Sequence, residues 1–144
     1  MPQSDSEKSA GQTLISPKFI LIGEDDIDDQ EFLKEIFFSV NNSFKLVFAT
    51  NGKKIISQLM DLPDDLLPCL ILMDYNMPEL NGAEILETLR KDKRYFRIPK
   101  IIWSTSNSEM YRNICLELGA NDYLIKPSNV REMEEAVKYM LSFC

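Results

Sequence analysis

Four short apolar runs in this chain each end at polar or charged side chains. The runs are residues 19–22, 69–73, 101–103 and 123–125, and they lead into Glu24 and Asp25, Asp74, Ser104 and Lys126. If the runs are parallel strands of one sheet, their carboxyl ends meet at the edge where open α/β sheets bind ligands. The pattern then predicts one crevice with three carboxylates, a hydroxyl and an ammonium, which suits a divalent cation and a phosphoryl group.

Longer segments with helical spacing separate these runs. Alternation of this kind is typical of βα units and a parallel sheet, and it predicts a (βα)5 domain. The apolar stripe of the first helix, about 27–40, begins at Ile27, and that of the last helix, about 129–142, begins at Val130. Ser106 or Asn107 is expected to cap the fourth helix.

Size and charge restrict the class of protein. At 144 residues with a formal charge of −7, the chain is large enough for one well-buried core and repels nucleic acid and anionic membranes. No apolar stretch has the length of a membrane span. Residues 1–17 lack the apolar region of a signal peptide and are expected to be a flexible tail before a domain at 18–143.

Cysteine and histidine usage adds two expectations. Three cysteines, an odd number without metal-type spacing, predict reduced thiols and a cytoplasmic location, with Cys69 as a small core residue. The chain contains no histidine. It therefore cannot use histidine in catalysis, as a metal ligand or as its own phosphohistidine.

Asp74 carries the strongest chemical signal. A carboxylate at the end of an apolar run is partly desolvated, which is costly unless it is paired or bound to a metal. Two carboxylates 4 Å apart repel by about 4 kcal/mol at an effective dielectric of 20, so grouping Asp74 with Glu24 and Asp25 requires a compensating cation, which Mg²⁺ and Lys126 together can supply. A neutralised Asp74 is available as a nucleophile. Taken alone, Glu24 and Asp25 also fit an acidic first turn that complements a helix dipole.

The ordered motifs resemble the receiver domain of two-component response regulators over about residues 18–143. They are Ile20-Leu21-Ile22-Gly23-Glu24-Asp25-Asp26, Ile71-Leu72-Met73-Asp74-Tyr75-Asn76-Met77-Pro78, Ile98-Pro99-Lys100-Ile101-Ile102-Trp103-Ser104 and Asn121-Asp122-Tyr123-Leu124-Ile125-Lys126-Pro127. The resemblance implies a flavodoxin-like, doubly wound three-layer sandwich with strand order 2-1-3-4-5.

The resemblance also implies a role for each site residue. Asp74 is the phosphoacceptor, and Glu24, Asp25, Asp74 and the backbone carbonyl of Asn76 hold Mg²⁺, for which Mn²⁺ can substitute. Ser104 and Lys126 bind the phosphoryl group, and Tyr123 is the switch aromatic whose ring turns inward. Asn76 and Ser106 tune the phosphate lifetime. The Lys126–Pro127 bond is expected to be cis.

The implied function is phosphoacceptor signalling rather than enzymatic turnover, with slow self-dephosphorylation at most. Only 18 residues follow Lys126, so a single-domain response regulator is expected. Its donor is a sensor histidine kinase or a histidine phosphotransfer protein, and its output is a phosphorelay or a surface read by a downstream protein. The expected readout surface, which also serves for a homodimer, combines the fourth helix, fifth strand and last helix.

Three alternatives stay open. The first is a pseudo-receiver that acts as a binding module without phosphorylation. The second is a metal-dependent phosphatase of the haloacid-dehalogenase kind, which usually needs a second aspartate where Asn76 stands. The third is a flavodoxin-type cofactor module, whose first loop needs amide and hydroxyl groups to cradle a phosphate, whereas Glu24-Asp25-Asp26 repels one in the absence of a metal.

Overall fold

Residues 18–144 are described by the computed structural model, so the tail predicted for residues 1–17 lies outside the described residues. Five strands form one parallel sheet in the order β2-β1-β3-β4-β5. They are β1 (Phe19–Gly23), β2 (Lys45–Ala49), β3 (Leu70–Asp74), β4 (Lys100–Ser104) and β5 (Asp122–Ile125). The predicted strand order is confirmed.

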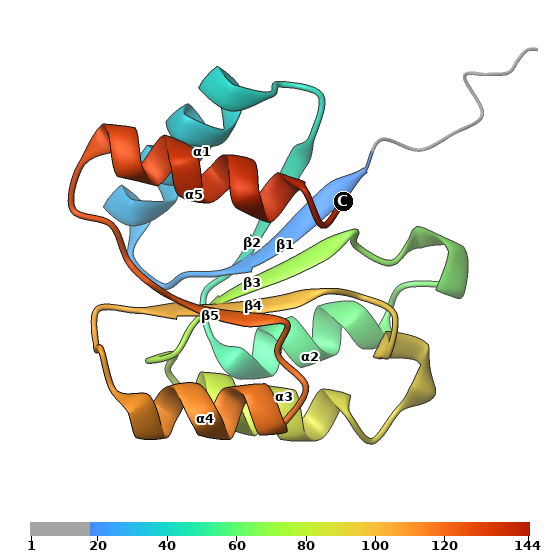
Figure 1. Ribbon diagram of the computed structural model, residues 1–144. Helices are drawn as coiled ribbons and strands as arrows, with labels where there is room; N and C mark the ends of the chain where they lie inside the picture. Colours follow the sequence, from blue (N-terminus) through green and yellow to red (C-terminus); the bar gives the residue numbers. More distant parts are fainter. Residues whose placement is uncertain (1–17) are drawn as a thin grey trace, which may run out of the picture.

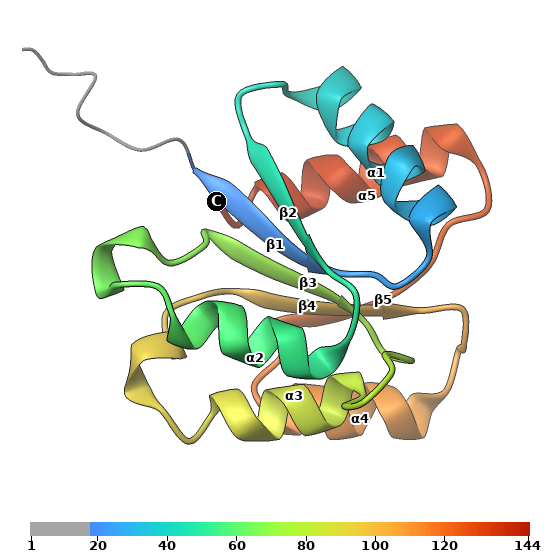
Figure 2. The ribbon, with the colours of Figure 1, turned by 180° about the vertical axis from the view of Figure 1, so that it is seen from behind.

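Helices cover both faces of this sheet. They are α1 (Ile27–Val40), α2 (Gly52–Met60), α3 (Gly82–Leu89), α4 (Glu109–Glu117) and α5 (Val130–Leu141), with short 3₁₀ turns η2 (Asp64–Leu66) and η3 (Lys93–Tyr95). Figure 1 shows α1 and α5 on one face and α2, α3 and α4 on the other, and Figure 2 shows the same three layers from behind. The doubly wound α/β class is therefore confirmed.

The central strands are apolar on both sides because both of their faces are covered. Side chains alternate along a strand, so Ile20 and Ile22 of β1 pack towards α1 and α5. Leu21 packs towards α2 and α3 on the opposite face. This burial on both faces explains the continuous apolar runs in the sequence. The first polar residue after each run lies where the strand ends, at the carboxyl edge of the sheet.

Three local predictions about the helices are wrong. Ile27 and Val130 are 70% and 52% exposed, because each is the first residue of its helix and the sheet does not cover that turn. Ser108, whose side chain accepts a hydrogen bond from the Tyr111 N–H, caps α4 in place of Ser106 or Asn107. Ser106 stays in the preceding loop because its N–H donates to the Ser104 hydroxyl.

The prediction of three reduced thiols is also wrong. Cys69 and Cys144 form a disulfide across a sequence separation of 75 residues, and Cys115 is the buried free thiol. Only the tertiary fold brings the residue before β3 next to the residue after α5, so spacing along the chain does not reveal the pair. None of the helices within residues 18–144 combines the length and apolar character that crossing a membrane requires.

Candidate functional site

The end of β1 places Glu24 inside the carboxyl edge of the sheet. Its N–H donates to the Ala49 carbonyl at 3.0 Å, and its own carbonyl accepts from the Gln30 amide at 2.8 Å. The Asp26 N–H donates to Glu24 Oε2 at 3.2 Å. These contacts hold a carboxylate in place although Glu24 is only 1% exposed.

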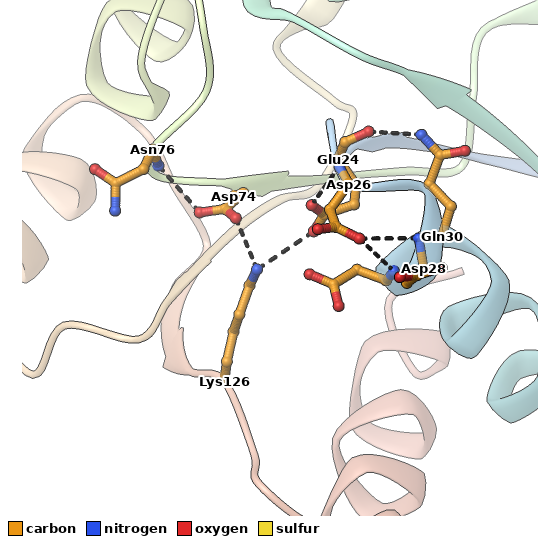
Figure 3. Close-up of polar contacts among 8 residues, drawn as sticks. Glu24, Asp26, Asp28, Gln30, Asp74, Asn76 and Lys126 are labelled. Carbon is orange, nitrogen blue, oxygen red and sulfur yellow. Dashed lines mark hydrogen bonds and ion pairs between the residues drawn. The ribbon is translucent and has the colours of Figure 1, made fainter.

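Lys126 joins two strand ends that are distant in the sequence. Its Nζ donates to Asp74 Oδ2 at 2.7 Å and to Glu24 Oε1 at 3.3 Å, as Figure 3 shows. Its backbone N–H donates to the Ser104 carbonyl at 2.8 Å. The other carboxylate oxygen of Asp74 accepts from the Asn76 N–H at 3.0 Å. The structure thus brings together Glu24, Asp74 and Lys126, as the strand-end pattern predicted.

The peptide bond that follows Lys126 differs from its prediction. No cis peptide bond occurs in residues 18–144, so the bond to Pro127 is trans and the expectation of a cis bond is wrong. The trans form is the more stable one for a residue before proline by about 0.5–1 kcal/mol. The trans bond is compatible with the contacts of Lys126 to both carboxylates.

Burial and the contacts within the site shift the pKa values of Glu24 and Lys126. Burial raises the pKa of Glu24 above its ordinary value of 4.5, and the opposing charge of Lys126 does not reverse this shift. Burial would lower the pKa of Lys126, but the hydrogen bonds and charges of Asp74 and Glu24 together raise it above 10.5. Both pKa values can be raised because Lys126 lies closer to Asp74 than to Glu24. The ammonium therefore stabilises the charged form of Glu24 too weakly to offset the effect of burial.

A Glu24→Gln variant is expected to gain stability relative to the wild type as the pH rises from about 4.5 in metal-free buffer. The folded state of the wild type holds the Glu24 proton more tightly than the unfolded state, because the pKa of Glu24 is raised. The contribution of Glu24 to stability therefore falls as the pH rises through its folded pKa. Urea unfolding at pH 4.5 and pH 7.5 checks this. The exposed Glu87→Gln variant is the matched control, and a difference from wild type for Glu24→Gln that changes no more than that of Glu87→Gln between the two pH values would contradict the prediction.

The oxygen donors at this edge fit a hard divalent cation. Asp25 and Asn76 are exposed beside the buried Glu24 and half-buried Asp74. Three carboxylates against one ammonium leave negative charge uncompensated, and carboxylate and carbonyl oxygens are the ligands that Mg²⁺ prefers. Within residues 18–144, no three acidic, histidine or cysteine side chains already form a metal-binding group, and the Lys126 ammonium contacts both Glu24 and Asp74.

Ser104, Ser106 and Tyr123 form a hydrogen-bonded chain beside these charges. Ser104 is fully buried, and its hydroxyl oxygen accepts from the Ser106 N–H at 3.0 Å. The Tyr123 hydroxyl donates to the Ser106 carbonyl at 3.0 Å, and Tyr123 is 2% exposed. Tyr123 thus points inward in this structure, and the backbone of Ser106 links it to Ser104.

Two connections near the site are absent from the sequence-based prediction. Tyr75, the residue after Asp74, stacks on Tyr111 of α4 with ring centroids 4.6 Å apart and an interplanar angle of 14°. Arg112 of α4 donates to the Tyr123 carbonyl at 2.8 Å. The sequence offered a tyrosine directly after Asp74, and a tyrosine and an arginine in the segment of α4. These residue types do not define a contact by themselves.

Comparison with known proteins gives a family model and several relatives. The model described as "Response regulator receiver domain" matches residues 20–138. Transcriptional regulatory protein CpxR of Escherichia coli (strain K12) is 36% identical over 122 residues, which cover 85% of this chain and 48% of CpxR. The chain thus spans about half the length of CpxR. Two-component response regulator ORR5 of Oryza sativa subsp. japonica is 32% identical over 103 residues, 70% of this chain and 75% of ORR5.

Solved structures show the same architecture. The Mn²⁺-bound form of response regulator Rcp1 superposes with a TM-score of 0.76 at 28% identity, covering 88% of this chain and 94% of Rcp1. Response regulator RPA3017, from red light signalling in R. palustris, has a TM-score of 0.79 at 28% identity, covering 88% of this chain and 93% of RPA3017.

Proposed function

Because the chain belongs to the response regulator receiver domain family, we propose that it accepts a phosphoryl group on the carboxylate of Asp74. The observation that carries this proposal is the position of the Lys126 ammonium, 2.7 Å from Asp74 Oδ2 and 3.3 Å from Glu24 Oε1. A cation held at this point can stabilise charge on phosphoryl oxygens next to the nucleophile. Asp74 is half-buried, and so it remains accessible to a donor.

The donor in this proposal is a phosphohistidine on a histidine kinase or a histidine phosphotransfer protein, since this chain has no histidine. A carboxylate oxygen of Asp74 attacks phosphorus in line, the P–N bond to the imidazole breaks, and the imidazole leaves with a proton. Such transfers depend on positioning and on electrostatic stabilisation rather than on covalent work by the protein. The proposed location is therefore the cytoplasm, where the catalytic domains of such kinases meet their receivers.

Three groups of the chain have defined tasks in this reaction. Lys126 pairs with the phosphoryl oxygens as the Asp74 carboxylate loses its charge in forming the acyl phosphate. The Ser104 hydroxyl accepts from Ser106 but keeps its own proton, so it can donate that proton in a hydrogen bond to a phosphoryl oxygen. Glu24, Asp25, Asp74 and the Asn76 carbonyl would hold Mg²⁺ or Mn²⁺, which supplies further positive charge to the same oxygens when bound.

The output of the proposed switch is a change at the surface formed by α4, β5 and α5. A phosphoryl oxygen that draws the Ser104 hydroxyl also moves Ser106, because the two residues are hydrogen-bonded. Ser106 in turn holds Tyr123. The stack of Tyr75 on Tyr111 also connects the loop after Asp74 directly to α4. A downstream protein or a second copy of the chain reads this surface.

Trp103 provides the test because it is the only tryptophan and Lys126 Nζ lies 5.5 Å from the centre of its ring. In wild type, Mg²⁺ followed by beryllofluoride, which mimics a phosphoryl group on aspartate, is expected to change the Trp103 fluorescence in two steps. Asp74→Asn should abolish the beryllofluoride step. Asp65→Asn, an exposed carboxylate on η2, should keep both steps as the matched control.

The same titration distinguishes the alternatives. A wild-type protein whose fluorescence responds to neither addition would overturn the phosphoacceptor proposal and would favour a pseudo-receiver. Incorporation of labelled phosphate from acetyl phosphate into wild type, and its absence from Asp74→Asn, provides an independent measurement. Labelling of Asp74→Asn to the wild-type level would mean that another residue is the acceptor.

A further inference from the structure

A second reactive feature lies at the amino edge of the sheet, opposite the edge that carries Asp74. Cys69 directly precedes β3, Cys144 follows the end of α5, and their sulfurs are bonded. Figure 1 shows the end of the chain beside the first residues of β1 and β3. Five residue steps along a strand separate Cys69 from Asp74, about 17 Å at 3.3 Å per residue. The disulfide is therefore separate from the phosphoacceptor site.

The two cysteines of the disulfide are only partly buried, unlike the third cysteine. Cys69 and Cys144 are both half-buried, and Cys69 lines an open cavity of about 620 Å³ together with Lys18 and Leu67. The Lys18 ammonium donates to the Cys144 backbone oxygen at 3.0 Å, so a positive charge, which favours thiolates, lies next to the backbone of Cys144. Cys115 is fully buried, and burial raises the pKa of its thiol to about 11.

The last turn of α5 connects Cys144 to the surface formed by α4, β5 and α5. Phe143, the neighbour of Cys144, packs edge-to-face on Tyr139 at 5.3 Å. The Tyr139 hydroxyl donates to Asp122 at 2.5 Å, and Asp122 lies 3.7 Å from the Arg112 guanidinium. A bond that fixes Cys144 therefore also fixes the turn from which Tyr139 reaches β5 and α4.

We propose that Cys69 and Cys144 form a reversible thiol–disulfide site that reacts with dithiols and, when oxidised, holds the last turn of α5 against the start of β3. Disulfides in cytosolic proteins are usually transient, in catalysis or redox sensing, and a partly buried pair near a lysine suits that use if the chain is in the proposed cytoplasmic location. The inference goes beyond the proposed function and requires no phosphoryl transfer at Asp74.

The reaction is a two-electron exchange between two sulfur pairs. A thiolate of the dithiol attacks one sulfur of the Cys69–Cys144 bond, and the other sulfur leaves as a thiolate that takes up a proton. The second thiol of the reagent then loses its proton and resolves the mixed disulfide. The protein gains two electrons and two protons, and the dithiol is oxidised to its disulfide. The reverse exchange with an oxidised dithiol restores the bond.

The test uses the full chain in mixtures of reduced and oxidised dithiothreitol without denaturant. Alkylation and mass spectrometry are expected to show Cys69 and Cys144 reacting together in one two-electron transition, while Cys115 stays unmodified. Reduction should lower the Tm by about 5–15 °C, the range expected for loss of one cross-link in a domain of this size. Hydrogen exchange should rise at residues 139–143 and stay constant at residues 20–22.

Two variants make the result unambiguous. Cys69→Ser with Cys144→Ser should show the reduced Tm and the faster exchange in either buffer, whereas Cys115→Ala should respond to redox as wild type does. A pair that stays thiol in oxidised buffer, or that dithiothreitol reduces only after unfolding, overturns the proposal. Equal exchange at residues 139–143 in the two redox states overturns it as well. Beryllofluoride binding at Asp74 is measured separately, so failure of one proposal leaves the other testable.

Discussion

Replacing Lys126 by methionine is expected to lower the free energy of unfolding by about 3–5 kcal/mol at pH 7 in the presence of a chelator. The side chains of Glu24 and Asp74 are 2% and 13% exposed, so loss of the ammonium leaves two facing carboxylates without a counter-charge. Methionine keeps the apolar stem beside Trp103, so the variant isolates the charge. Urea denaturation measures the effect, and the m-value of the variant is compared with that of wild type.

Lys53→Met is the matched control for Lys126→Met. Lys53 lies 3.5 Å from Glu79, but these side chains are 70% and 50% exposed, and removal of such a surface pair changes stability by less than about 1 kcal/mol. Equal losses of unfolding free energy in the two variants would mean that the ion pairs of Lys126 contribute no more than a surface pair does. Because the pKa of Lys126 is raised above 10.5, its contribution should be complete at neutral pH and lost only as the pH rises past this value.

The fold was predictable because its physical signals are local. Strands buried on both faces read as continuous apolar runs, and the first polar residue of each run marks the functional edge. The failures at Ile27 and Val130 concern helix ends. There the periodicity of the sequence continues, but the sheet that would bury the side chain does not extend as far. Burial at a helix end depends on the sheet underneath, which the helix sequence does not encode.

The site was only partly predictable for a related reason. The sequence indicates the carboxylates and Lys126 because each follows directly after a strand. The contacts that connect them to the surface formed by α4, β5 and α5 depend on tertiary geometry. Tyr75 meets Tyr111, and Cys69 meets Cys144, only after separate βα units have packed together. The odd number of cysteines pointed away from a disulfide, since composition does not show which thiol is buried and which two are adjacent.

Saturating Mg²⁺ is expected to raise the free energy of unfolding of wild type by about 2.7 kcal/mol at a concentration of 100 times its Kd. The Lys126 ammonium contacts the carboxylates of Glu24 and Asp74 at the carboxyl edge, and the exposed Asp25 next to Glu24 adds a third negative charge there. A divalent cation compensates the remaining negative charge in the folded state, whereas the unfolded chain does not hold these oxygens together. Thermal unfolding at increasing Mg²⁺ concentration measures this linkage as a rising Tm.

Removal of the Asp25 or the Asp74 carboxylate should remove most of the stabilisation by Mg²⁺. Asp25→Asn and Asp74→Asn each take away one negative oxygen ligand, and their Tm should become nearly independent of Mg²⁺ in the same range. Glu35→Gln on α1 has the same change of charge at an exposed position, and its Tm should follow wild type. If all three variants respond as wild type does, Mg²⁺ acts by general screening rather than at this edge of the sheet. A response lost only in the two site variants instead locates the cation beside Asp74, where the phosphoryl oxygens would need it.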